Sequence, residues 1–140
     1  MDIPKTLERL EALAVPVIGY KTNVFPAFYS RESNFRITLS ADSPQAIANI
    51  YNKNLAVNIN SGLLVANPVP IELEIPKDVI DKYIALALKE CEENRITGKS
   101  VTPFLLKRIV VLTKGDSLKT NIALALNNVR LATEIAAALK

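Results

Sequence analysis

The stretch that decides the fold reads Val15-Pro16-Val17-Ile18-Gly19-Tyr20-Lys21-Thr22-Asn23-Val24-Phe25-Pro26-Ala27-Phe28-Tyr29. Its first five residues form an apolar run that predicts a strand. Only 6% of the chain is aromatic, yet four aromatic residues gather in the loop that follows: Tyr20, Phe25, Phe28 and Tyr29. An apolar loop after a strand either fills a core or lines a pocket, and composition favours the core.

The composition is unusually apolar for a small domain. A chain of 140 residues corresponds to about one domain. Hydrophobic residues make up 49% of it, with a mean hydropathy of +0.19. This excess favours a partner surface, either another subunit or further parts of a larger domain, over an especially well-packed core.

Charge and hydropathy do not support a nucleic-acid-binding, membrane-spanning or secreted protein. The net charge is only +3, and Lys and Arg alternate with Asp and Glu, so nucleic-acid binding is not indicated. No apolar run approaches the length of a membrane span, and no secretory signal is visible. The single Cys91 fits a reducing compartment, so we expect a cytoplasmic protein.

Helical and strand signals alternate along the chain. They predict helices over residues 2–14, from Ser43-Pro44, from Pro76, from Thr102-Pro103 and from Asp116-Ser117, with strands at Val15–Gly19, Phe35–Leu39 and Leu63–Ala66. We expect an α/β fold with a three-layer, α/β/α-like architecture. Such a small sheet followed by three helices predicts that residues 1–140 are a single partial domain, the C-terminal portion of a larger mixed-sheet domain.

The three candidate site residues are uncharged, and two of them follow predicted strands. Thr22 follows strand Val15–Gly19, and Asn67 follows strand Leu63–Ala66. Ligands of open α/β sheets gather at such strand ends, although turn formation explains both residues at least as well. Asn121 shares a helix face with Asn128, and this polar stripe is either exposed or aimed at a polar group.

Other chemistries have little support. The chain has no His and only four Gly, which excludes His-based triads or metal sites and glycine-rich phosphate loops. Two acidic pairs, Asp78 with Asp81 and Glu72 with Glu74, are far more typical of solvated surface than of a metal or general-acid site. We therefore predict no catalytic residue and no metal ligand in this chain.

Four blocks in order resemble the pseudouridine-5′-phosphate glycosidases. They are Gly19–Tyr29, the segment Ser61-Gly62-Leu63-Leu64-Val65-Ala66-Asn67-Pro68-Val69-Pro70, the segment Gly98-Lys99-Ser100-Val101-Thr102-Pro103-Phe104-Leu105-Leu106, and the helix Ser117–Leu124 with Asn127–Ala132. The resemblance covers nearly the whole chain but only the C-terminal half of the family's length. Asn23-Val24 departs from it, since the family carries acidic residues there.

The resemblance implies an activity and its components. The family reversibly cleaves pseudouridine 5′-phosphate to uracil and ribose 5-phosphate, using a lysine nucleophile, a glutamate proton donor and a Mn²⁺ ion held by an aspartate. These groups lie upstream of the matched segment, so this chain alone is expected to be inactive. The ligand-binding position that does map is Asn121, whose carboxamide suits the imide edge of uracil.

The sequence is compatible with two functions. The chain is either the C-terminal part of such a glycosidase, or a non-catalytic truncated or split-gene product that serves as a structural or oligomerisation domain. The resemblance implies a homotrimer, and small-molecule substrates would bind only together with the missing half.

Overall fold

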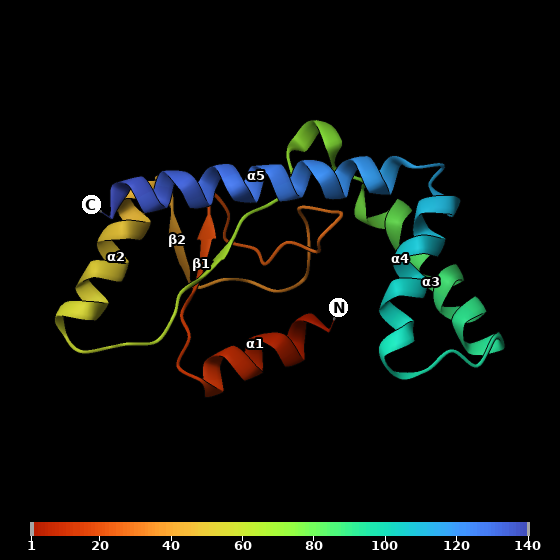
Figure 1. Ribbon diagram of the computed structural model, residues 1–140, viewed down its shortest axis with the longest axis horizontal. Coiled ribbons are helices and arrows are strands. Elements are labelled where there is room, and N and C mark those ends of the chain that lie inside the picture. Colours follow the sequence, from red (N-terminus) through yellow and green to blue (C-terminus); the bar gives the residue numbers. More distant parts are fainter. Residues whose placement is uncertain (1, 140) are drawn as a thin grey trace.

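The computed structural model describes residues 2–139. Within them the chain forms five α-helices, three strands and two short 3-10 helices (Figure 1). The element order is helix, strand, strand, helix, strand and then three α-helices, as the sequence predicts. None of the helices described is both long and apolar enough to cross a membrane.

The sheet is parallel and has three strands. Strand β1 (Val17–Tyr20) lies between β2 (Leu39–Ala41) and β3 (Leu64–Ala66). Ile18 is in register with Leu39 on one side and Val65 on the other. Because all three strands point the same way, their carboxyl ends meet at one edge of the sheet.

Helices cover both faces of this sheet. Alternate strand residues point to opposite faces. Val17 and Leu64 pack in a cluster with Ile3 of α1 (Ile3–Ala12). Ile18 and Val65 instead pack with residues of α2 (Pro44–Ala56) and α5 (Asp116–Ala138). This arrangement confirms the predicted three-layer α/β/α architecture.

A helical pair lies beside the sheet. Helices α3 (Lys77–Glu93) and α4 (Val101–Leu112) share a core that includes Ile80 and Ile109. The longest helix, α5, runs from this pair across to the sheet and α2 (Figure 1). The short helices η1 (Ile71–Leu73) and η2 (Gly98–Ser100) precede α3 and α4.

The aromatic loop fills two cores. Phe25 is buried with α1 and β3, whereas Tyr29 is buried with α3 and α4. Phe28 packs edge-on against Tyr29, with 4.7 Å between the ring centroids. Of the two alternatives for this loop, the structure therefore shows core filling at these positions.

One strand was predicted too early in the chain, the start of α4 differs from the prediction by one residue, and α5 begins at Asp116 as predicted but with a different cap. Phe35 and Ile37 pack into the α1 cluster, and the Ile37 N–H donates to the carbonyl of Asn23, so β2 begins only at Leu39. Helix α4 begins at Val101, one residue before Thr102-Pro103. The N-cap of α5 is Gly115, whose φ of 94° lies in the left-handed region that glycine adopts freely.

Candidate functional site

The carboxyl edge of the sheet holds two of the predicted site residues. Thr22 lies two positions after β1, and Asn67 directly follows β3. These strands pair in parallel, with Gly19 opposite Ala66, so both residues lie at the same edge. The Thr22 hydroxyl accepts a hydrogen bond from the Val24 N–H and donates to the Val24 carbonyl, each over 3.1 Å. Thr22 therefore stabilises the turn that begins the aromatic loop.

Asn67 connects the sheet edge to α5. Its side-chain Nδ2 donates to Oδ1 of Asn128 over 3.0 Å, and Nδ2 of Asn127 donates to the carbonyl oxygen of Pro68 over 3.1 Å. We call these two contacts the asparagine clamp. The Asn67–Asn128 pairing was not predicted, although two adjacent Asn residues inside an Ala/Leu-rich helix are poor helix formers and signal a polar contact.

Asn121 lies on the same side of α5 as Asn128, about 10 Å further towards the helix start at 1.5 Å per residue. The preceding residue, Thr120, donates its hydroxyl to the carbonyl of Leu73 over 2.7 Å. Helix α5 is thus fixed on both sides of Asn121. Within residues 2–139 no hydrogen bond involves the Asn121 side chain, which is partly exposed. Its carboxamide can therefore both donate to and accept from a ligand.

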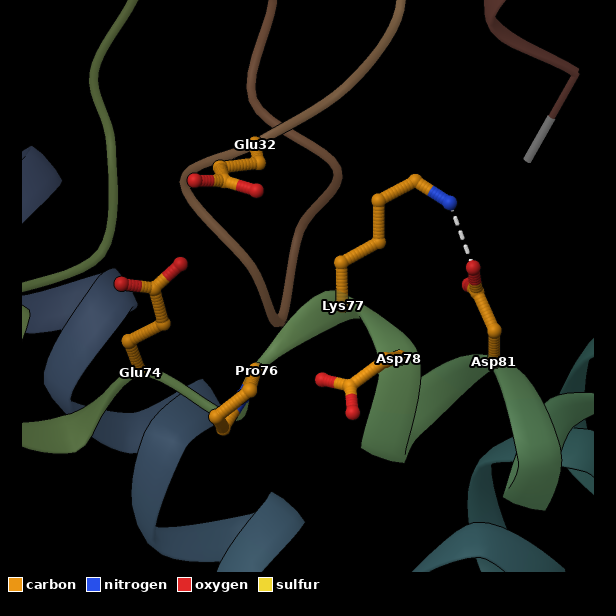
Figure 2. A pocket seen from close by; sticks show the side chains of 6 residues that line it. All are labelled: Glu32, Glu74, Pro76, Lys77, Asp78 and Asp81. Carbon is orange, nitrogen blue, oxygen red and sulfur yellow. Dashed lines mark hydrogen bonds and ion pairs between the residues drawn. The ribbon is translucent and has the colours of Figure 1, made fainter.

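An acidic hollow lies between the aromatic loop and the start of α3 (Figure 2). Its lining residues are Glu32, Glu74, Pro76, Lys77, Asp78 and Asp81. Lys77 forms an ion pair with Asp81. Oε1 of Glu74 accepts hydrogen bonds from the Ser30 hydroxyl over 3.0 Å and from the Arg31 N–H over 2.7 Å. Two of the four carboxylates are therefore already engaged by protein groups.

These residues do not fit a manganese site. In the part of the chain that the structure describes, no group of three or more His, Cys, Asp or Glu side chains is arranged to hold a metal ion. Glu72 and Glu74, one of the two acidic pairs noted in the sequence, differ in exposure to solvent. Glu72 is exposed, whereas Glu74 is half-buried. We therefore derive no catalytic step through a metal from this chain.

A second hollow lies between η1, α3 and the first turns of α5. It is lined in part by Tyr83, Asp116, Lys119 and Thr120. Neither hollow is lined by Thr22, Asn67 or Asn121. The side chain of Asn121 is therefore not part of either concavity.

Electrostatic perturbation occurs away from the sheet edge. A hydrogen bond from Arg108 lowers the pKa of Glu90, and burial raises the pKa of the Tyr29 phenol. Both groups belong to the α3–α4 side of the molecule, where Cys91 is also buried. These two shifts reflect packing and ion pairing on that side of the molecule.

The sequence is similar to known proteins along its whole length. A profile of the family described as Indigoidine synthase A like protein matches residues 1–138. A pseudouridine-5′-phosphate glycosidase of Mesorhizobium japonicum is 52% identical over 139 residues, which are 99% of this chain but 46% of that protein. The same-named protein of Kosmotoga olearia is 45% identical, over 99% of this chain and 48% of its own length. The chain thus spans about half the length of the curated relatives it matches.

Two solved structures share the fold. The prealnumycin C-glycosynthase AlnA, in complex with ribulose 5-phosphate, superposes with a TM-score of 0.89 at 30% identity, over 99% of this chain and 46% of AlnA. An indigoidine synthase A-like protein from Thermotoga maritima gives a TM-score of 0.82 at 42% identity, over 97% of this chain and 44% of its own. With the profile match over residues 1–138, these likenesses show that the chain belongs to the indigoidine synthase A-like family, in which its curated relatives are pseudouridine-5′-phosphate glycosidases.

Proposed function

We propose that this chain contributes the uracil side of the substrate pocket in a pseudouridine-5′-phosphate glycosidase, which reversibly cleaves pseudouridine 5′-phosphate to uracil and ribose 5-phosphate. The observation that carries the proposal is the position of Asn121. Its carboxamide has no hydrogen-bond partner within residues 2–139, on a helix held on both sides by the asparagine clamp and by Thr120. A carboxamide that is held in place and has no protein partner can donate to and accept from the polar edge of a ligand.

The names of the relatives support the reaction class. The curated relatives are glycosidases of a nucleotide whose base is joined through carbon, and AlnA is a C-glycosynthase crystallised with ribulose 5-phosphate. Both names concern a C-glycosidic bond, and both ligands include a five-carbon sugar phosphate. We therefore assign to the complete protein a substrate that contains a pentose phosphate. The reaction breaks or forms the bond between the sugar and a ring carbon atom.

The proposed role of this chain is binding rather than bond cleavage. Uracil presents N–H donors and carbonyl acceptors side by side, and one carboxamide can pair with both. The lysine nucleophile, the glutamate proton donor and the Mn²⁺ ion that the family resemblance implies would act from residues outside this chain. We assign the residues present here to positioning the base, which lowers the barrier by orienting the reacting bond.

The test joins this chain to the part of a relative that it does not match, which gives a restored protein, and varies Asn121. In the restored protein, Asn121→Ala should lower kcat/KM about 5- to 150-fold, because losing a hydrogen bond to a desolvated ligand costs ~1–3 kcal/mol. Asn121→Leu should lower it further, since its side chain adds bulk and leaves the polar edge of uracil unpaired. Arg130→Ala, on another side of the same helix, is the control and should leave kcat/KM unchanged.

Melting temperatures distinguish a substrate-binding role of Asn121 from that of a solvated helix residue. An unchanged or raised melting temperature together with impaired turnover would place Asn121 in the site. Unchanged turnover with a raised melting temperature would remove it, because Ala is simply the better helix former.

The alternative function is a non-catalytic structural or oligomerisation domain. It is favoured by the many large apolar side chains that are exposed in residues 2–139, four of them on α5. Both proposals predict that the 140-residue chain alone releases no uracil, with or without Mn²⁺. They differ in the restored protein, which is active only under the first proposal.

A further inference from the structure

The loop between α2 and β3 contains an Asn residue in a sequence context that no other Asn of the chain shares. Residues 57–63 belong to no helix or strand, and both Asn residues of this loop, Asn58 and Asn60, are exposed. Asn60 is followed by Ser61, whereas every other Asn of the chain is followed by a bulkier residue. A small following residue allows its backbone nitrogen to approach the carboxamide of the Asn side chain.

The backbone nitrogen after Asn60 is also one that the fold leaves without an acceptor. Within residues 2–139 no hydrogen bond engages the Ser61 N–H. The N–H groups that follow the Asn residues of α2 and α5 lie inside those helices, where each donates to the carbonyl four residues earlier. Elsewhere Pro68 has no N–H, and the other N–H groups that follow an Asn have acceptors: Val24 donates to Oγ1 of Thr22, Phe35 to Oγ of Ser33, Ile59 to the carbonyl of Asn54, and Arg95 to the carbonyl of Glu92.

The carboxamide of Asn60 is held only weakly. Its Nδ2 lies 3.5 Å from the carbonyl oxygen of Asn58, at the long limit of hydrogen bonding. The loop also has room beside it, since a Cβ atom built on the exposed Gly62 would meet nothing within 4 Å. An exposed, weakly bonded side chain changes rotamer readily, so Cγ of Asn60 can turn towards the Ser61 nitrogen.

We propose that Asn60 is a site of spontaneous deamidation. The Ser61 backbone nitrogen gives its proton to a base in the solvent and attacks Cγ of Asn60. A bond forms between that nitrogen and Cγ, the bond from Cγ to Nδ2 breaks, and the amide nitrogen leaves as ammonia. Water then opens the resulting succinimide ring at either of its two carbonyl carbons. The product is aspartate or isoaspartate at position 60, and either one lowers the net charge of +3 by one.

The proposed modification lies away from the candidate functional site. Asn60 precedes β3, at its amino end, whereas Asn67 follows the carboxyl end of the same strand. Isoaspartate carries the main chain through the side-chain carbonyl, which lengthens the loop by one bond directly before Ser61. The Ser61 hydroxyl has no hydrogen-bond partner within residues 2–139, so no side-chain bond of Ser61 opposes this change. Deamidation at Asn60 therefore does not depend on glycosidase activity.

Peptide mapping by mass spectrometry tests the proposal on the unaltered 140-residue chain. The chain is kept in warm, mildly alkaline buffer beside a synthetic peptide of residues 57–63, which sets the time scale. Asn60 should be the first Asn to be converted. Asn58 is the internal control, and it should react at least ~tenfold more slowly because the β-branched Ile59 hinders the attack. Methylation by a protein isoaspartate methyltransferase should detect the isoaspartate product.

Two variants test the role of the following residue. Ser61→Val should slow the conversion of Asn60 at least ~fivefold, because a β-branched side chain hinders the approach of its own backbone nitrogen. Gly62→Ala is the matched control in the same loop, and it should leave the rate unchanged because the reacting pair is intact. Circular dichroism of each variant checks folding.

Three results would overturn the proposal. The first is an Asn60 that stays intact in the folded chain while the peptide is converted, and the second is conversion of Asn58 as fast as Asn60. The third is an unchanged rate at Asn60 in folded Ser61→Val. The comparison of Asn60 with Asn58 in the unaltered chain needs no variant, so it decides the question even where Ser61→Val does not fold. Activity is not measured, so a failure of the proposed glycosidase function leaves these outcomes unaffected.

Discussion

Asn67, directly after β3, donates its side-chain Nδ2 to Oδ1 of Asn128 on α5, with 3.0 Å between the two atoms. This contact joins residues 61 positions apart and links the edge of the sheet to the longest helix. The neighbouring bond from Asn127 to the Pro68 carbonyl reinforces it. The position of Asn121 relative to the strand ends is set in part by this clamp.

A double-mutant cycle measures the Asn67–Asn128 contact. We expect Asn67→Ala and Asn128→Ala to show a coupling energy of about 0.5–1 kcal/mol, the lower part of the usual range, because the bond is exposed to water. Asn128→Ala alone should cost less than Asn67→Ala, since Ala also improves helix propensity. Urea unfolding at neutral pH provides the four free energies, and a coupling near zero would mean that water replaces the bond without loss.

Gly19 is required by a close approach of the backbone. A Cβ atom built on Gly19 would lie 2.1 Å from the carbonyl oxygen of Thr22, whereas a Cβ on Gly62 would meet nothing within 4 Å. Gly19→Ala should therefore destabilise the fold by about 1–3 kcal/mol through overpacking. Gly62→Ala, the control, should be neutral or slightly stabilising because it restricts the unfolded chain. Equal melting temperatures for the two variants would contradict this account.

Glu74 connects the aromatic loop to the segment before α3. Its Oε1 accepts hydrogen bonds from the fully buried Ser30 and from the Arg31 N–H. Glu74→Ala leaves both donors without this partner and should cost about 1–3 kcal/mol in the free energy of unfolding. Glu72→Ala, at an exposed position on η1, should change it by less than about 0.5 kcal/mol. If the two substitutions have the same effect in denaturant titrations, the Glu74 contacts do not stabilise the loop.

The ion pair between Glu90 and Arg108 predicts a pH dependence of stability. Arg108 donates to both carboxylate oxygens of Glu90, with 2.7 Å from Nη2 to Oε1, and this hydrogen bonding lowers the pKa of Glu90 below its ordinary value of 4.5. A lowered folded-state pKa means that the stabilisation is complete above the ordinary value and is lost as the pH falls through the folded-state value.

Urea midpoints at pH 7 and pH 3 test this dependence. Glu90→Gln should lower the midpoint at pH 7, and the difference from the unaltered chain should shrink at pH 3. Glu93→Gln is the control, because Glu93 pairs with Lys89 only at 3.9 Å and both side chains are exposed. A Glu90→Gln deficit of the same size at both pH values would show that charge is not its cause.

Local signals predicted much of the fold. Ser43 accepts a hydrogen bond from the Ala46 N–H and caps α2, with Pro44 in the first turn, as the Ser-Pro pair indicates. The three helices after β3 and the short apolar strand that became β3 were likewise readable from periodicity and turn residues. These features depend on neighbours within a few positions, so the sequence itself contains their causes.

The positions of the other features depend on distant contacts. Alternation predicted a strand over Phe35–Leu39, but Phe35 and Ile37 are drawn into the core beside α1, and the strand begins where pairing with β1 becomes available. Burial of Phe25 and Tyr29 also depends on the surfaces that other elements bring to the loop.

The sequence by itself determined the order of the elements, the parallel edge at which Thr22 and Asn67 lie, and the polar stripe that contains Asn121. Only the tertiary structure decided that Asn67 bonds to Asn128, that Glu74 accepts a hydrogen bond from Ser30, and that four large apolar side chains of α5 stay exposed in residues 2–139. The reason is physical. Helix and turn preferences arise from short-range sterics and hydrogen bonds, whereas a side chain's partner is set by which distant surfaces are packed together when apolar area is buried.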